Sequence, residues 1–169
     1  RAGKGPALVA APTSVMSGWV SQARSFAPSL DVRLFHGATR AKALEKLGKG
    51  SLLVTSYDVL AMEIDAIEKI RFATLVVDEA QMIKNSATQR AKAIVRVNAE
   101  ARIALSGTPV ENHLGELWSI FRVLNPSLLG SLARFKERFA VPIEKQGDPS
   151  KRDTLAKLLR PFILRRTKA

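Results

Sequence analysis

The chain has 169 residues, enough for one domain but not for two of full size. Hydrophobic residues make up 46% of it and charged residues 25%, so it can build a core and is not a disordered tail. It has no cysteine, which excludes disulfides, thiolate chemistry and cysteine-bound zinc and fits a cytosolic or nuclear setting. No apolar run approaches the roughly 20 residues that span a membrane, so we expect no membrane partner.

Charge is the first informative feature. Lys and Arg total 27 against 15 Asp and Glu, a net charge of +12, and such an excess indicates a polyanionic partner. Residues 134–169 carry eleven basic and four acidic side chains, whereas residues 73–133 carry six and five. The nearly neutral middle therefore holds something other than phosphate-binding charge. A solvated, solubilising surface explains the excess equally well.

Short apolar runs alternate with longer amphipathic stretches, which is typical of βα units around a parallel sheet. The predicted strands are 7–11, 31–35 (an edge strand), 51–55, 73–77 (the most apolar, expected at the centre) and 102–105. Four helices are predicted between and after these strands. The first begins at a cap on Thr13 or Ser14, and the second runs over 57–69. The third begins at a capping box of Ser86 and Gln89, and the fourth begins at Asn112. The last of these has an apolar stripe of Leu114, Leu117, Trp118, Phe121 and Leu124.

Strand signals end at Pro126, after which short basic helices at about 131–139 and 152–159 flank a loop at 142–149. The predicted fold is a three-layer α/β domain with a mainly helical C-terminal extension. We place the division between these two parts at 125, giving regions 1–125 and 126–169.

The end of the strand 73–77 carries an acidic pair. In an open parallel sheet, ligands bind outside the carboxyl ends of the strands. Asp78 there could hold Mg²⁺ through water beside a nucleotide triphosphate, and Glu79 could polarise an attacking water. Two acidic residues that simply end a strand before a helix are the alternative.

Two hydroxyls surround a glycine at the end of the strand 102–105. Ser106 and Thr108 could hydrogen-bond the loop from Asp78 to Gln81 and report the state of a nucleotide, although a plain turn explains them as well. Ser106 is a poor candidate nucleophile because it lacks the G-x-S-x-G elbow. His36 and His113 are too few for a triad or a metal cluster.

Hydroxyl pairs also follow two other strands. Thr13 with Ser14 and Thr55 with Ser56 stand near predicted helix starts, where hydroxyls and backbone N–H groups can bind phosphates. Helix capping alone accounts for either pair.

Together these segments resemble the Swi/Snf chromatin-remodelling type of ATPase within the superfamily-two helicases. The resemblance is carried by residues 78–85, DEAQMIKN, and by residues 105–118, LSGTPVENHLGELW. Pro12, Thr13, Ser14 and Trp19 look like motif Ia, Thr55, Ser56 and Tyr57 look like motif Ib, and residues 159–168, LRPFILRRTK, look like the exit from the first motor lobe.

The resemblance implies a RecA-like first lobe of a two-lobe, DNA-stimulated ATPase that uses ATP and Mg²⁺ and moves on duplex DNA. Asp78 would take the magnesium role and Glu79 the water-activating role. Gln81, Ser106 and Thr108 would couple hydrolysis to lobe movement. Thr13, Ser14, Thr55 and Ser56 would lie along the nucleic-acid backbone.

The sequence departs from the family pattern at several points. No G-x-x-x-x-G-K-[ST] phosphate loop occurs, and Gln81 stands where histidine is more usual. We expect a fragment that begins after that loop, lacks the second lobe and hydrolyses no ATP alone. A non-catalytic basic nucleic-acid-binding module and an RNA helicase of the same superfamily are the alternatives. The Ala- and Arg-rich texture favours a bacterial cytoplasmic, nucleoid-associated protein, or a nuclear one if eukaryotic.

Overall fold

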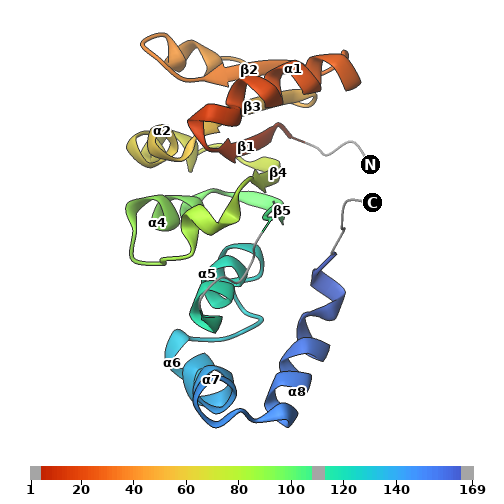
Figure 1. The fold of residues 1–169 in the computed structure, drawn as a ribbon. Coiled ribbons are helices and arrows are strands. Elements are labelled where there is room, and N and C mark those ends of the chain that lie inside the picture. The colour runs from red at the N-terminus through yellow and green to blue at the C-terminus, as the bar shows by residue number, and fades with distance from the viewer. Residues whose placement is uncertain (1–4, 108–112, 165–169) are drawn as a thin grey trace.

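The computed structural model describes residues 5–107 and 113–164, and its strands form one parallel five-stranded sheet in the order β2-β3-β1-β4-β5 (Figure 1). The strands are β1 (Ala7–Ala11), β2 (Asp31–Phe35), β3 (Ser51–Ser56), β4 (Phe72–Val77) and β5 (Ala99–Ala104). The predicted parallel sheet and the edge position of residues 31–35 are confirmed. The most apolar strand, β4, lies inside the sheet, but β1 occupies the middle.

The helices are α1 (Met16–Phe26), α2 (Tyr57–Met62), α3 (Ile64–Ile67), α4 (Gln89–Arg96), α5 (Leu114–Leu124), α6 (Leu132–Phe135), α7 (Val141–Gln146) and α8 (Pro149–Leu159). Short 3₁₀ turns lie at Thr13–Val15, Arg40–Leu44, Ala80–Ile83 and Arg160–Phe162, and Lys136–Ala140 is a π-helical segment. None of the described helices is long and apolar enough to cross a bilayer.

Both faces of the sheet are covered because side chains along a strand alternate between the faces. In β1, Leu8 and Ala10 join the core under α2, α3 and α4, whereas Val9 and Ala11 join the core under α1. These four side chains are fully buried. The chain therefore has the predicted three layers, with helices on both sides of a parallel sheet.

The helix starts differ from the predicted caps. Neither Thr13 nor Ser14 caps α1; the chain first makes a 3₁₀ turn, closed by the Val15 N–H on the Pro12 carbonyl at 3.1 Å. Thr88, not Ser86, caps α4, because its hydroxyl is the one that accepts the Ala91 N–H, at 3.2 Å. Asn112, the predicted cap of α5, lies outside the described residues.

The predicted helix 57–69 is two helices in the structure. Glu63 leaves the helical conformation between α2 and α3, with φ −107° and ψ 16°. Its carboxylate accepts a hydrogen bond from Arg40 at 2.8 Å, while Ile64 and Ile67 of α3 are buried. The break at Glu63 thus separates α2 from α3, whose isoleucines pack in the core.

The region after α5 is more helical than predicted. Residues 132–146 run from α6 through the π-helical segment into α7, so no loop begins at Pro142. Pro142 stands at the start of α7, directly after the π-helical segment, so the proline coincides with the change of helical hydrogen-bond pattern. The chain turns at Gly147 (φ +65°), and the Asp148 carboxylate then accepts the Ser150 and Lys151 N–H groups at the start of α8.

Helix α5 contacts both parts of the chain. Its Leu117, Trp118 and Phe121 pack with side chains of the helices α6 and α8 and the π-helical segment, while Ile120 and Val123 pack in the core of the sheet. The Trp118 indole donates a hydrogen bond to the Gly130 carbonyl at 3.0 Å. Four members of the predicted stripe thus face the helical core and Leu124 faces the core of the sheet, whereas Ile120 and Val123 were not predicted. The helices α6–α8 lie beyond β5, far from β2 (Figure 1).

Candidate functional site

Main-chain hydrogen bonds bring three strand ends together at the carboxyl edge of the sheet. The Asp78 N–H donates to the Ala10 carbonyl at 2.9 Å, at the end of β1. The Leu105 N–H donates to the Val77 carbonyl, and the Ala80 N–H donates back to the Leu105 carbonyl, both at 2.8 Å. The loop after β4 and the loop after β5 are therefore held side by side, as their predicted joint role requires.

Asp78 is fixed through its side chain and its main chain. Its Oδ1 accepts the N–H of Glu79 at 2.9 Å, and its Oδ2 accepts the indole N–H of Trp19 at 2.7 Å. Its carbonyl oxygen accepts the Tyr57 hydroxyl at 2.5 Å. Each carboxylate oxygen can accept more than one hydrogen bond, so the half-buried group can still bind water.

Glu79 has a left-handed backbone, with φ 50° and ψ 57°. For a residue other than glycine this conformation is uncommon and costs about 1–3 kcal/mol, and it clusters at functional sites. The turn separates the two acidic side chains: Asp78 contacts Trp19, whereas Glu79 contacts Gln81. The adjacent carboxylates therefore have different surroundings, which suits two different roles.

A line of hydrogen bonds joins Ser106 to Glu79. The Ser106 hydroxyl donates to Gln81 Oε1 at 2.8 Å, and Gln81 Nε2 donates to Glu79 Oε2 at 2.5 Å. The reverse amide orientation would place Gln81 Oε1 against the carboxylate, so the network defines which way the amide points. The predicted hydrogen bond between Ser106 and the loop after β4 is present, while Thr108 lies outside the described residues.

Tyr57 is 2% exposed and remains a hydrogen-bond donor. Burial raises the pKa of its phenol above the ordinary value, and the negative charges of Asp78 and Glu79 raise it further. The phenol is therefore protonated at neutral pH. The sequence placed Trp19 and Tyr57 in the segments that look like motifs Ia and Ib but gave neither a contact with Asp78.

A cavity of about 660 Å³ runs along residues 102–107, at the open edge of β5, and reaches Asp78 and Glu79 at one end. Burial lowers the pKa of the Arg102 guanidinium. Its N–H groups donate to the carbonyls of Ile94, Val97 and Val123 near the C-terminal ends of α4 and α5. Arg102 therefore holds two helices against β5 and has few donors left for a ligand.

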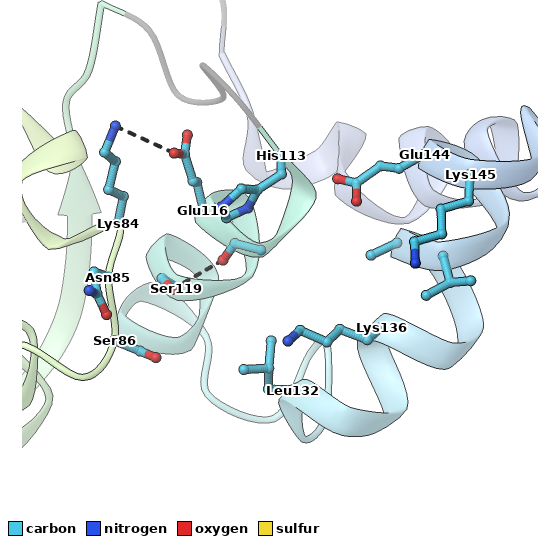
Figure 2. A pocket seen from close by; sticks show the side chains of 13 residues that line it. Lys84, Asn85, Ser86, His113, Glu116, Ser119, Leu132, Lys136, Glu144 and Lys145 are labelled. Carbon is cyan, nitrogen blue, oxygen red and sulfur yellow. Dashed lines mark hydrogen bonds and ion pairs between the residues drawn. The ribbon is translucent and has the colours of Figure 1, made fainter.

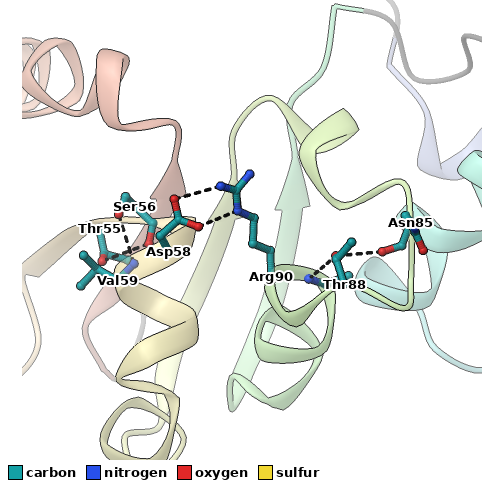
Figure 3. A network of polar contacts seen from close by, with 8 residues as sticks. Thr55, Ser56, Asp58, Val59, Asn85, Thr88 and Arg90 are labelled. Carbon is teal, nitrogen blue, oxygen red and sulfur yellow. Dashed lines mark hydrogen bonds and ion pairs between the residues drawn. The ribbon is translucent and has the colours of Figure 1, made fainter.

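The two hydroxyl pairs have opposite environments. Thr13 and Ser14 are exposed in the turn before α1. Thr55 and Ser56 are 0% and 2% exposed, and Thr55 donates to the Phe35 carbonyl. Ser56 accepts the Val59 N–H as the cap of α2, as Figure 3 shows. Both hydroxyls are thus buried and used internally, and the contact of this segment with a nucleic-acid backbone stays a prediction.

Next to this cap, an ion pair links α2 to α4. Arg90 Nε and Nη2 donate to the two carboxylate oxygens of Asp58 at 2.7 and 2.9 Å (Figure 3). The two side chains pair with each other at the surface, so we assign this ion pair a structural role. The pair holds α2, which follows β3, against α4, which follows β4.

A second cavity, also of about 660 Å³, lies between the segment 84–86, the start of α5 and the helices α6 and α7 (Figure 2). Lys84 Nζ lies 3.4 Å from Glu116 Oε1, and Glu116 is only 4% exposed. The Ser119 hydroxyl is used inside α5, on the Gly115 carbonyl. This cavity belongs to the junction of the two cores, away from the acidic pair.

The acidic pair fits Mg²⁺ only as part of a larger set of ligands. Within residues 5–107 and 113–164, no three His, Asp or Glu side chains cluster closely enough to hold a metal ion. Mg²⁺ usually keeps several waters and binds one or two carboxylates together with substrate phosphates. Asp78 therefore fits this mode of binding, in which the phosphates supply the remaining ligands.

A parallel sheet covered by helices on both faces, with this acidic pair at its carboxyl edge, defines a RecA-like α/β domain. The chain belongs to the SNF2-related domain family, whose model matches residues 1–169.

Individual relatives agree with this assignment. The chain is 42% identical to the putative ATP-dependent helicase/translocase YwqA of Bacillus subtilis, over 98% of this chain and 18% of that protein. It is 37% identical to the TATA-binding protein-associated factor mot1 of Schizosaccharomyces pombe, over 96% of this chain and 9% of that protein. The solved SWI2/SNF2 ATPase core of Sulfolobus solfataricus in complex with dsDNA matches 96% of this chain with 41% identity and a TM-score of 0.87. The chain spans 34% of that structure, so it is much shorter than the proteins it matches.

Proposed function

We propose that this chain is part of the first motor lobe of a DNA-stimulated ATPase that moves on duplex DNA. The observation that carries the proposal is the line from Ser106 through Gln81 to Glu79, next to Asp78 at the same edge of the sheet. A strand end that takes part in no reaction has no need for two carboxylates held by different partners, or for a glutamate with a left-handed backbone.

The acidic pair divides the work between its two members. Mg²⁺ bound with ATP would offset the phosphate charge and orient the terminal phosphate. Asp78, whose carboxylate orientation is fixed, would hold that ion through water. Glu79 would accept the proton of the attacking water. Gln81 and Ser106 would hold the Glu79 carboxylate in place and connect it to the loop after β5; Thr108 would act from the same loop.

The phosphate-binding part of such a site is absent from this sequence, which has no G-x-x-x-x-G-K-[ST] motif. Strand β5 is hydrogen-bonded only to β4 among the described strands, and its Ile103 and the following Leu105 are 47% and 42% exposed. We propose that a strand of a longer parent protein, carrying the phosphate loop, pairs with this edge of β5. The regions 1–125 and 126–169 would then be the sheet-forming part of the lobe and its extension towards a second RecA-like lobe.

Duplex DNA is the proposed polyanion. The exposed hydroxyls of Thr13 and Ser14, the net charge of +12 and the dsDNA bound to the Sulfolobus relative support it. Phosphate contacts of this kind are independent of base sequence. The Ala- and Arg-rich composition and the Bacillus relative support a bacterial parent that acts in the cytoplasm at the nucleoid.

The experiment is ATP hydrolysis by the full-length parent with duplex DNA, single-stranded DNA, RNA or no polymer. We expect strong stimulation by duplex DNA. Stimulation by RNA alone would move the protein to the RNA helicases. No turnover with any polymer would leave the non-catalytic binding module, and this proposal would be wrong.

A further inference from the structure

Two aromatic side chains from different helices donate hydrogen bonds to Asp78. Trp19 lies in the first turns of α1, and its indole N–H reaches Oδ2 at 2.7 Å. Tyr57 is the first residue of α2, and its hydroxyl reaches the carbonyl oxygen of the same aspartate at 2.5 Å. The side chain and the backbone of Asp78 are therefore held from two sides.

The indole is suited to orient a carboxylate. Its N–H is a donor only, so it cannot exchange roles as a hydroxyl can. Its side chain packs against the buried cluster that includes Val9, Ala11 and Met16, which restricts its movement. A nitrogen–oxygen distance of 2.7 Å is that of a charge-assisted hydrogen bond. With the Glu79 N–H on Oδ1, both carboxylate oxygens are held and the plane of the group is fixed.

Tyr57 acts on the main chain. Its hydroxyl holds the Asp78 carbonyl immediately before the left-handed Glu79. The side chain is 2% exposed, so the phenol has a fixed position. It stabilises the turn after β4 rather than the orientation of the carboxylate.

Trp19 also connects Asp78 to the exposed surface. The turn Thr13–Val15 leads directly into α1, and Trp19 follows Val15 by one helical turn. A movement of the turn Thr13–Val15 would be transmitted to Asp78 through the first turn of α1 and the hydrogen bond from Trp19.

From these contacts we propose that Trp19 is a positioning residue: its indole N–H sets the orientation of the Asp78 carboxylate towards the metal and links that carboxylate to the exposed turn. The inference rests on the proposed function, in which Asp78 holds Mg²⁺. Partners that orient a direct metal ligand typically contribute tenfold to a hundredfold to metal affinity, and because Asp78 would hold the ion through water we expect the lower end of that range.

The test measures the Mg²⁺ concentration at which the full-length parent binds a non-hydrolysable ATP analogue half-maximally. Trp19→Phe keeps an aromatic ring and removes the N–H. We expect this variant to need roughly tenfold more Mg²⁺ than the wild type. Tyr57→Phe should shift the midpoint less, because its hydroxyl holds only the carbonyl.

Trp118→Phe is the matched control. It also loses an indole hydrogen bond, to the Gly130 carbonyl, but it lies in the core of the helical part. We expect its Mg²⁺ midpoint to stay within about twofold of the wild type. A second version of the test replaces Trp19 by benzothienylalanine, which keeps the shape of the indole and lacks the N–H, so that it separates the lost donor from any packing defect of phenylalanine.

The outcomes separate the two proposals. An unchanged Mg²⁺ midpoint with benzothienylalanine at position 19, or equal shifts at positions 19 and 118, would overturn the role of Trp19 and leave the ATPase proposal standing. Tighter Mg²⁺ binding would overturn it too, because the indole would then compete with the metal. A wild-type parent that binds the nucleotide without any dependence on Mg²⁺ would contradict the proposed role of Asp78 itself.

Discussion

The ends of β3 and β4 lie at the same edge of the sheet, on either side of β1, and both carry polar residues. At the end of β3 the hydroxyls of Thr55 and Ser56 are buried and used for internal hydrogen bonds. At the end of β4 the carboxylates of Asp78 and Glu79 are half-buried and border a cavity. The two strand ends therefore differ in whether solvent reaches their polar side chains after the local hydrogen bonds are made.

The largest expected effect is that of Glu79→Gln in the full-length parent. The new amide oxygen can still accept the Gln81 hydrogen bond, but the side chain no longer accepts a proton, so turnover should fall by roughly 10²–10⁴-fold while nucleotide binding persists. Steady-state hydrolysis and binding of an ATP analogue measure the two quantities.

Its control is Glu100→Gln, near the start of β5. This carboxylate pairs with Arg71 at 3.0 Å, at the opposite edge of the sheet. Its turnover should equal that of the wild type. Normal turnover by Glu79→Gln would remove Glu79 from the mechanism.

Ser106→Ala should have the next largest effect. It removes the hydroxyl that holds the Gln81 amide, so the Glu79 carboxylate loses a fixed neighbour. We expect DNA-stimulated turnover to fall by about tenfold, which is the effect of about 1.4 kcal/mol, with little change in ATP affinity. Rates with and without duplex DNA measure this effect.

Ser119→Ala provides the comparison for Ser106→Ala, since among the residues that the structure describes its hydroxyl bonds only the Gly115 carbonyl, within α5. It should leave the stimulation by DNA intact. Equal losses in the two variants would show that the line from Ser106 to Glu79 has no special part in turnover.

Thr55→Val tests the other strand end. The valine keeps the shape but loses the hydrogen bond to the Phe35 carbonyl, and the fully buried site should lose about 1 kcal/mol of unfolding free energy. Binding of duplex DNA should not change. Denaturant unfolding and DNA titration measure both.

Thr74→Val in β4 serves as the control for this variant, because its hydroxyl makes no hydrogen bond within the described residues and is half-buried. Its stability should be close to that of the wild type. A Thr55→Val parent that is fully stable and binds DNA several-fold more weakly would restore Thr55 as a nucleic-acid contact.

The smallest expected effect is that of Thr13→Ala combined with Ser14→Ala. Both side chains are exposed and neither caps α1, so stability should not change. Loss of two hydroxyl contacts to phosphates should weaken DNA binding by about twofold to fivefold. Ser25→Ala, exposed near the other end of α1, should bind DNA normally; if the double variant does so too, the turn does not contact DNA.

The sequence was sufficient for the number and order of the strands along the chain and for the edge at which Asp78, Glu79 and Ser106 meet, because apolar runs alternating with amphipathic stretches favour a parallel sheet. It placed the start of the last strand at 102, whereas β5 begins at Ala99. It did not reveal the Trp19 hydrogen bond, because its donor and acceptor stand 59 residues apart and meet only in the folded sheet. Nor did it show that Thr55 is buried, since a hydroxyl at a strand end looks the same whether its partner is a ligand or the Phe35 carbonyl.

The helical part was less predictable for a local reason. Pro142 suggested a loop, but the residues before it form a π-helical segment that continues into α7, and the proline falls where the helical hydrogen-bond pattern changes. Sequence patterns read at a period of 3.6 residues do not detect such a segment.

The most direct test is a structure of the full-length parent with Mg²⁺, a non-hydrolysable ATP analogue and duplex DNA. The account predicts the metal beside Asp78 with the Trp19 hydrogen bond retained, a water within hydrogen-bonding reach of Glu79, and DNA phosphates at the turn Thr13–Val15. A nucleotide bound away from the end of β4, or a metal held without Asp78, would contradict it.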